Sequence, residues 1–473
     1  MASPKLLTAL FPELTWYRGE FVADMALLLS DVGIIAVTTK TEMIAEIDRR
    51  RALDEYITQR RLPQRAVLPG FVNTHSHAFQ RAIRGRTEYP RSNSNGSEDF
   101  WSWRETMYQA ALRLNPSDVE AISQAVYVEM VKSGITRVGE FHYLHHQSDG
   151  TPYPDPDELA LRVLSGARSA GIKVTLLRSF YERAGVDRPE PVGAQKIFSD
   201  PSVDSYLESL ERLSALGCSI GVTAHSVRAV TRDALLQLHT FAKERELPFH
   251  IHVSEQAKEI SESLQEYGQR PVQLLHALGC LDSSTTLVHA IHLTPEEIQA
   301  IGESECFIAS CPTTERNLGD GIVAARELWQ AGAVFTFGTD SQCQICLPED
   351  ARQLEYHLRL RDQKRSLLFD HEEQAAGEFL KMLTQNGSRS LGEASGGVIE
   401  VGAPSDLIAI DLDHLSLCGS SPKSLPLDIV FSATPDTVTD VWIDGCEVVS
   451  DRRHRAEQQA MSNLRRVLPK LRG

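Results

Sequence analysis

The sequence predicts an α/β protein in which a TIM-like (β/α)8 barrel carries a small β-sandwich domain built from both chain ends. Three observations predict this fold: a series of short apolar runs in the middle of the chain, amphipathic segments between these runs, and strand-like patterns at either end. Strands that alternate with helices form a parallel sheet, and about eight of them suggest closure into a barrel. Closure cannot be seen in a sequence, so an open doubly wound sheet is the alternative.

The two chain ends are predicted to form one β domain. Residues 1–66 are polar and irregular, and we expect them to supply its N-terminal part. Residues 397–473 return to strand-like patterns and are expected to supply its C-terminal part. The runs that suggest strands in these ends are 33–37, 398–399, 407–410 and 438–449. Residues 67–396 remain for the barrel.

The barrel strands are predicted from apolar runs that are short and rich in β-branched residues. These runs are residues 67–75, 135–142, 172–178, 219–225, 248–253, 284–290, 305–310 and 333–340. Helices are predicted between them from start signals such as Pro116-Ser117-Asp118 and Thr294-Pro295 and from stop signals such as Gly171. The predicted helices are residues 117–132, 155–170, 231–246, 294–301 and 348–362.

Composition excludes several classes of protein. The chain has 473 residues with 48 Lys+Arg against 64 Asp+Glu, a formal net charge of −16. This acidic balance argues against nucleic-acid binding, which needs a basic face. No apolar run approaches the roughly 20 residues that span a bilayer, so no membrane partner is expected. The 8 Cys lack a short-spaced framework and indicate reduced thiols in a cytoplasmic protein. A homodimer is left open.

Ionisable side chains gather where the predicted strands end. His75 and His77 close the first run, and their spacing places both imidazoles on one face of an extended chain. The others are His142, His225, His250 with His252, His289 and Asp340. The carboxyl ends of barrel strands converge on one mouth, so these residues would meet. A lone strand histidine is more often a hydrogen-bonded core residue, but so many strand ends together predict a site for Zn²⁺ or a similar divalent ion.

Other polar residues lie near the same predicted mouth. Glu255 follows His252 by three residues and is placed to transfer protons, although an acid at this point would also complement a helix dipole. Arg104 and Arg228 would bind carboxylates bidentately. The non-functional alternative is that each arginine is an ordinary solvated charge at the surface. Gln80 and Tyr143 offer hydrogen bonds from adjacent loops. These residue types together predict a small-molecule substrate.

Two loops after strand ends are longer than usual, and a pair of cysteines lies near Asp340. Residues 78–116, which include Asn93 to Gly96, and residues 143–155 are expected to act as lids or to supply substrate contacts. Cys343 and Cys346 form a single C-x-x-C, which is weak evidence for structural zinc or redox chemistry. No role is assigned to this pair.

The motifs resemble those of a known family. Leu68-Pro-Gly-Phe-Val-Asn-Thr-His-Ser-His77 is similar to the first-strand signature of the amidohydrolase superfamily, and residues 397–407 resemble the segment by which those enzymes enter their C-terminal β unit. Within the superfamily the chain is most similar to the N-formimino-L-glutamate deiminases. The segments that carry this similarity are residues 75–82, 100–105, 140–143, 225–230, 287–290 and 315–321.

The resemblance implies a site and a reaction. It implies one zinc ion per chain, catalytic assistance from Glu255 and His289 beside Asp340, and hydrolysis of N-formimino-L-glutamate to N-formyl-L-glutamate and ammonia in histidine degradation. The implied metal ligands are His75, His77, His252 and Asp340. The implied substrate contacts are Gln80, Arg104, Tyr143, His225 and Arg228. His252 is preferred to His250 by its nearness to the strand end and by this resemblance, and Cys343 and Cys346 depart from the family pattern.

Three alternatives stay open at this point. The nearest is another deaminase of the superfamily that acts on a heterocyclic amine such as guanine, which needs a flat aromatic pocket. A ring-opening amidase is the second, and it would release no ammonia. A catalytically inactive barrel that serves as a scaffold is the third, and the candidate ligands and proton shuttle count against it.

Overall fold

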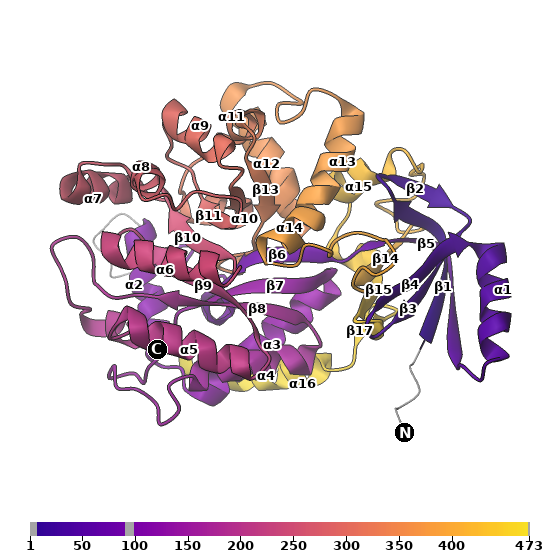
Figure 1. The fold of residues 1–473 in the computed structure, drawn as a ribbon, viewed down its shortest axis with the longest axis horizontal. Helices are drawn as coiled ribbons and strands as arrows, with labels where there is room; N and C mark the ends of the chain where they lie inside the picture. Colours follow the sequence, from indigo (N-terminus) through magenta and orange to yellow (C-terminus); the bar gives the residue numbers. More distant parts are fainter. Residues whose placement is uncertain (1–6, 90–98, 472–473) are drawn as a thin grey trace.

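The computed structural model describes residues 7–89 and 99–471, so Asn93 to Gly96 of the long first loop lie outside the described residues. An eight-stranded parallel sheet occupies the middle of the chain, and its strands pair in sequence order (Figure 1). The strands are β6 (Phe71–Ser76), β7 (Ile135–His142), β8 (Lys173–Phe180), β9 (Ser219–Ser226), β10 (Phe249–Val253), β11 (Thr285–His289), β12 (Phe307–Ser310) and β13 (Val334–Phe337). The eight strand predictions are therefore confirmed.

The sheet closes at the ends of its first and last strands. Ser76 and Asp340 form a parallel bridge, in which His77 N–H donates to the Asp340 carbonyl and Asp340 N–H donates to the His75 carbonyl, both at 3.0 Å. Gly338 permits this close approach, because a Cβ there would lie 2.7 Å from the Cβ of His75. The barrel is thus nearly closed, and the open doubly wound alternative is wrong.

Helices surround the barrel, and α2 borders the end where its strands finish (Figure 1). They are α2 (Phe100–Ala111), α3 (Pro116–Lys132), α4 (Glu158–Ala170), α5 (Val203–Ala215), α6 (Arg232–Glu244), α7 (Ala257–Tyr267), α8 (Pro271–Ala277), α9 (Pro295–Glu303), α10 (Pro312–Leu318), α11 (Ala325–Ala331), α12 (Leu347–Asp362), α13 (Glu372–Leu383) and α14 (Gln385–Ser390). Short 3-10 turns occur at η1 (Ala78–Ile83) and η2 (Gly193–Phe198). The predicted signals act as expected: Thr294 caps α9, and Gly171 ends α4 in a left-handed conformation.

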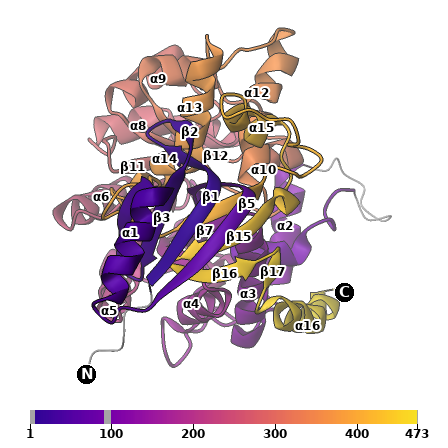
Figure 2. The same ribbon diagram turned by 90° about the vertical axis from the view of Figure 1, so that its right-hand side faces the viewer.

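The two chain ends form a separate mixed sheet of nine strands, which confirms the predicted β domain. Its strands are β1 (Leu7–Tyr17), β2 (Glu20–Ala23), β3 (Met25–Ser30), β4 (Gly33–Thr39), β5 (Ile57–Pro69), β14 (Leu407–Asp411), β15 (Val438–Ile443), β16 (Cys446–Ser450) and β17 (Arg453–His454). Figure 2 shows the indigo N-terminal and yellow C-terminal strands side by side, joined where β5 pairs with β14. Helix α1 (Lys40–Arg51) covers this sheet through Met43 and Ile47.

The C-terminal part also returns to the barrel. It contributes α15 (Leu425–Phe431), η3 (Pro435–Thr437), α16 (Glu457–Val467) and η4 (Leu468–Leu471). Helix α16 packs on α3, where Asn463 Nδ2 donates to Gln124 Oε1 at 2.9 Å. The strand expected at 398–399 does not form, because Ile399 packs into a hydrophobic cluster beside the small sheet from a turn. Among the described helices, none combines the length and apolar content that crossing a membrane requires.

Candidate active site

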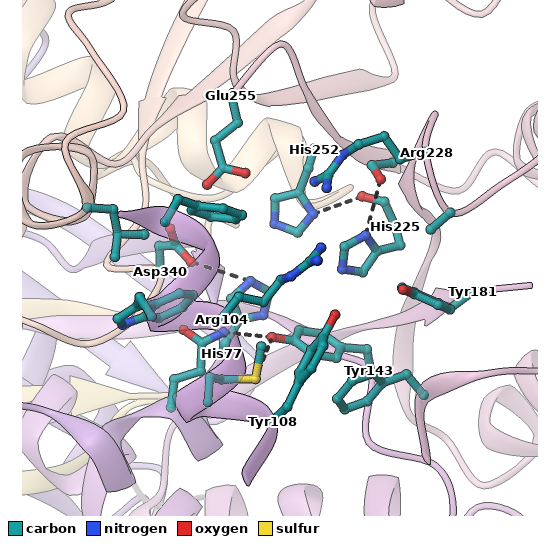
Figure 3. Close-up of a pocket in the computed structure, with 18 of the residues that line it drawn as sticks. His77, Arg104, Tyr108, Tyr143, Tyr181, His225, Arg228, His252, Glu255 and Asp340 are labelled. Atoms are coloured by element: carbon teal, nitrogen blue, oxygen red, sulfur yellow. Dashed lines mark hydrogen bonds and ion pairs between the residues drawn. The ribbon is translucent and has the colours of Figure 1, made fainter. Parts of the chain in front are cut away.

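A pocket opens at the carboxyl ends of the barrel strands (Figure 3). The space inside it, with its mouth, is about 680 Å³. The sequence-predicted residues that line it are His77, Gln80, Arg104, Tyr143, His225, Arg228, His252, Glu255, His289 and Asp340. His75 is fully buried and contacts His77 and His252. The fold therefore brings together all the candidate site residues that the resemblance implied, and their roles stay predictions.

Three imidazoles and one carboxylate converge within this pocket. Nε2 of His75 lies 3.2 Å from Nε2 of His77 and 3.1 Å from Nε2 of His252. Oδ1 of Asp340 lies 3.3 Å from Nε2 of His77 and 3.5 Å from Nε2 of His75. The four donor groups come from β6 and the residue that follows it, from β10 and from the residues after β13, which neighbour one another only because the barrel closes.

Backbone carbonyls fix how two of these rings present their nitrogens. Nδ1 of His77 lies 2.7 Å from the Phe141 carbonyl, and Nδ1 of His252 lies 2.9 Å from the His225 carbonyl. Each Nδ1–H therefore donates to the backbone and leaves the Nε2 lone pair facing the cluster. Burial lowers the pKa of His77 and lowers the pKa of His252 well below 6.5, so both rings are neutral.

This donor set fits a divalent ion. Lone pairs and a carboxylate oxygen that face one another across 3.1–3.5 Å repel unless a cation lies among them. The ligand atoms of a tetrahedral Zn²⁺ with bonds of about 2.0–2.1 Å lie roughly 3.3 Å apart, which matches these spacings. Neutral imidazoles with one carboxylate are also the ligands that Zn²⁺ accepts in hydrolytic sites. His75, His77, His252 and Asp340 therefore suit such an ion.

A second group of side chains surrounds His289. Its Nε2 lies 3.5 Å from Glu255 Oε1 and 3.7 Å from Asp340 Oδ2, and its Nδ1 lies 3.3 Å from Glu315 Oε1. Burial lowers the pKa of His289, but the three carboxylates outweigh it and raise that pKa to about 10. Burial also raises the pKa of Glu255, helped by Asp340 and opposed by His289. The arrangement suits proton transfer beside the donor cluster.

Four residues at the same strand ends have a left-handed backbone conformation. Ser254, His289, Ala290 and Asp340 have φ angles of 52°, 72°, 51° and 46°. Residues other than glycine rarely adopt this left-handed conformation, and such strain persists where the surrounding structure holds it in place. Hydrogen bonds do so here: Ala290 N–H donates to the Val253 carbonyl at 3.1 Å, and Asp340 N–H donates to His75.

The outer wall of the pocket carries two arginines. Arg104 projects from α2 and Arg228 from the turn after β9, and both extend into the pocket in Figure 3. Across residues 7–89 and 99–471, neither guanidinium forms an ion pair with a carboxylate. Gln80 Nε2 donates to Tyr143 Oη at 2.7 Å, and Gln80 Oε1 is buried without a hydrogen-bond partner. This wall therefore offers positive charge and free polar groups to a ligand.

Some candidate residues lie elsewhere. The His142 ring turns away from the pocket and lies 5.7 Å from the ring of His145, because Phe141 takes the inward position of β7. His250 directs Nε2 to the Ser390 carbonyl at 2.9 Å, outside the pocket, so His252 alone of the two reaches the donor cluster. Cys343 and Cys346 are both free thiols and form no disulfide.

Sequence reasoning missed much of the aromatic lining. Tyr108, Tyr181, Trp103 and Phe198 all border the pocket, and Glu315 holds His289. A signal for part of this set was present, because the pocket face of α2 follows the helical period. The residues of that face are Phe100, Trp103, Arg104, Met107 and Tyr108.

Comparison with known proteins shows the family of this chain. The model of the amidohydrolase family matches residues 66–448. The chain belongs to the amidohydrolase family. It is 38% identical over 411 residues to the formimidoylglutamate deiminase of Pseudomonas aeruginosa, covering 86% of this chain and 89% of that protein. It is 28% identical over 416 residues to the 8-oxoguanine deaminase of the same organism, covering 84% and 87% of the two chains.

Solved structures show the same architecture. The crystal structure of an amidohydrolase from Brucella melitensis superposes with a TM-score of 0.86 at 30% identity and covers both chains fully. An adenosine deaminase from Xanthomonas campestris with bound zinc superposes with a TM-score of 0.79 at 21% identity, covers 99% and 98% of the two chains, and shares the fold. Family and relatives together make this protein a hydrolase that acts on C–N bonds of small molecules, in the manner of a deiminase or deaminase.

Proposed function

We propose that this enzyme hydrolyses N-formimino-L-glutamate to N-formyl-L-glutamate and ammonia, the deimination step of histidine degradation. The observation that carries the proposal is that Arg104 and Arg228, without carboxylate partners among the described residues, share a pocket with the donor cluster. The substrate offers two carboxylates for these arginines and one amidine carbon for hydrolysis. Similarity to the formimidoylglutamate deiminase of Pseudomonas aeruginosa supports the same substrate.

We propose that His75, His77, His252 and Asp340 hold one Zn²⁺. Such an ion, when bound, would lower the pKa of an attacking water to about 7 and so make it nucleophilic at neutral pH. The cluster is buried, which strengthens electrostatic interactions within it.

The surrounding side chains would move the protons. Asp340 would accept a proton from the attacking water through Oδ2, the oxygen that faces His289 at 3.7 Å. The water oxygen would add to the formimino carbon while the terminal nitrogen takes a first proton from Glu255, whose raised pKa suits a proton carrier. The remaining hydroxyl proton of the adduct would then pass through Glu255 to the same nitrogen as the carbonyl forms and the C–N bond breaks, so that ammonia leaves. The proton held by Asp340 would afterwards return to Glu255. Glu315 orients His289 through Nδ1.

The outer wall would hold the glutamate part of the substrate. Arg104 and Arg228 would each bind a carboxylate, aided by Gln80, Tyr143 and His225. Because the chain carries a net charge of −16, its long-range field opposes an anionic substrate, and binding must come from local contacts. A half-buried and a buried guanidinium supply these contacts.

The competing substrate class is a planar heterocyclic amine. The aromatic walls at Tyr108, Tyr143 and Tyr181 and the similarity to the 8-oxoguanine deaminase of Pseudomonas aeruginosa favour it. Ammonia release from N-formimino-L-glutamate, guanine and 8-oxoguanine should be measured side by side, with and without chelator. We expect chelator-sensitive release from the first compound only. Faster ammonia release from guanine or 8-oxoguanine would contradict the proposal and would indicate a heterocyclic amine as the substrate.

A further inference from the structure

Three cationic side chains surround the indole of Trp101. The guanidinium carbon of Arg104 lies 4.4 Å from its ring centroid, that of Arg228 lies 5.4 Å away, and Nζ of Lys258 lies 4.4 Å away. These residues come from α2, from the turn after β9 and from the first turn of α7. Trp101 itself does not line the pocket, so it would influence a bound substrate only through the cationic side chains around it.

The indole is held in place by the start of α2. Asp99 caps the helix, and its side chain accepts the backbone N–H of Trp101 at 3.0 Å. The neighbouring Phe100 packs edge-on against the indole, with ring centroids 5.1 Å apart. A tryptophan side chain has few rotatable bonds, so a capped and packed indole is a rigid platform.

An aromatic ring and a carboxylate hold an arginine side chain in different ways. An ion pair with a carboxylate would occupy the N–H groups of the guanidinium and neutralise its charge. Stacking on an aromatic ring holds the guanidinium through its plane and leaves the N–H groups at its edge able to bind an anion. Arg104 has a second ring contact of this kind, 5.4 Å from the centroid of Tyr108. Both pocket arginines are thus positioned without a close ion pair among the described residues, and Arg228 also interacts electrostatically with the buried carboxylates of Glu255 and Glu259.

We infer that Trp101 is a positioning residue for the anionic end of the substrate, and that it selects amidines with two carboxylates over amidines with one. It does so by keeping Arg104 and Arg228 beside each other at the pocket wall. Like charges around one ring repel, and a bound dicarboxylate relieves that repulsion. This inference rests on the proposed function, because it takes the two arginines as carboxylate ligands.

The test compares Trp101→Leu and Trp101→Phe with the wild type as zinc-loaded enzymes. Trp16→Leu is a matched control, since Trp16 is half-buried in the small domain against Phe21. Ammonia release from N-formimino-L-glutamate and from N-formimino-glycine gives kcat and KM for a two-carboxylate and a one-carboxylate amidine.

We expect Trp101→Leu to lower kcat/KM for the glutamate compound about tenfold, chiefly through KM, with much less effect on the glycine compound. Trp101→Phe, which keeps a weaker π face, should lose only about threefold. Trp16→Leu should match the wild type. Equal losses for both substrates, a loss confined to kcat, or a Phe variant as poor as the Leu variant would each overturn the inference. If the Leu variant does not fold, unchanged selectivity in the Phe variant overturns it.

A binding measurement separates this inference from the proposed function. N-formyl-L-glutamate should raise the Tm of the wild type, and the rise should be much smaller in Trp101→Leu. If the wild type releases no ammonia from N-formimino-L-glutamate but shows this Tm difference, the proposed function fails and the role of Trp101 stands. If N-formyl-L-glutamate shifts neither Tm, or shifts both equally, the inference about Trp101 is wrong.

Discussion

The inner and outer parts of the pocket are built from different kinds of structure. The donor cluster stands on strand ends, where inter-strand hydrogen bonds and backbone carbonyls fix each imidazole. The arginine wall stands on a helix and a turn, and both Arg104 and Arg228 contact the ring of Trp101. Strand ends place groups with little freedom, whereas helices and turns can change without disturbing the barrel. Under the proposed function, the barrel would provide the hydrolytic chemistry and the wall would determine which amidine or amine enters.

Metal removal should have the largest effect, and it tests the inner part alone. We expect a chelator to lower kcat/KM by about 10⁴-fold or more, because water is a poor nucleophile until its pKa is lowered. Added Zn²⁺ should restore activity, which separates metal loss from unfolding. Ammonia release and metal content should be measured on the same samples. Full activity in metal-free protein would show that the donor cluster does not act through a metal ion.

The substitution Glu255→Gln should come next. It keeps the size and burial of the side chain but removes the proton carrier, so we expect kcat to fall by about 10²- to 10⁴-fold with metal content unchanged. Glu208→Gln, an exposed change on α5, is the matched control and should keep full activity. A near-normal kcat in Glu255→Gln would remove its assigned role.

The pH dependence of stability should sharpen the comparison, because His250 lies on the same strand as His252 but hydrogen-bonds the Ser390 carbonyl instead of joining the donor cluster. Burial lowers the pKa of His250 to about 4 from 6.5, so the unfolded chain binds the proton more tightly. Its contribution to stability is complete above pH 6.5 and is lost as the pH falls toward 4.

Between these pH values the wild type should lose about 3 kcal/mol more unfolding free energy than His250→Gln, which retains a donor for Ser390. Denaturant unfolding of the zinc-loaded proteins at several pH values measures the difference. Parallel stability curves for the two proteins would show that His250 does not stay neutral in the fold.

The smallest effect should come from the outer wall. We expect Arg228→Met to lower kcat/KM for N-formimino-L-glutamate about tenfold to thirtyfold, mainly through KM, because one charged hydrogen-bond partner is lost. Arg168→Met, at an exposed position of α4, is the control. Steady-state kinetics on both variants test the assignment, and an unchanged KM in Arg228→Met would reject the carboxylate contact.

The inner part was predictable from sequence, and much of the outer part was not. Strand runs that end in His77, His252, His289 and Asp340 could be recognised, because barrel topology alone places strand ends at one mouth. His142 shows the limit of that reasoning, since the alternation of β7 turns Phe141 inward instead. Counting inward and outward positions from His77 across neighbouring strands needs the sheet register, which the sequence does not contain.

The outer part depends on tertiary packing. Tyr181, which follows β8, and Phe198 of η2 reach the pocket through side-chain contacts that no local pattern encodes. Glu315 was noticed only inside a family motif, and its contact with His289 follows from how α10 begins after β12. The helical period of α2 is a signal that could have found the aromatic lining residues of that helix.

The bridge between Ser76 and Asp340 has a consequence for biosynthesis. The four residues proposed to hold the ion span the seam of the barrel, with two imidazoles at the end of the first strand and the carboxylate after the last. A nascent chain that has emerged only as far as β12 carries three of the four donors, and its first strand lacks a neighbour on one side. The complete set exists only once residue 340 has been synthesised and has reached β6. Stable zinc uptake would therefore mark molecules whose catalytic barrel has been translated and folded to its last strand.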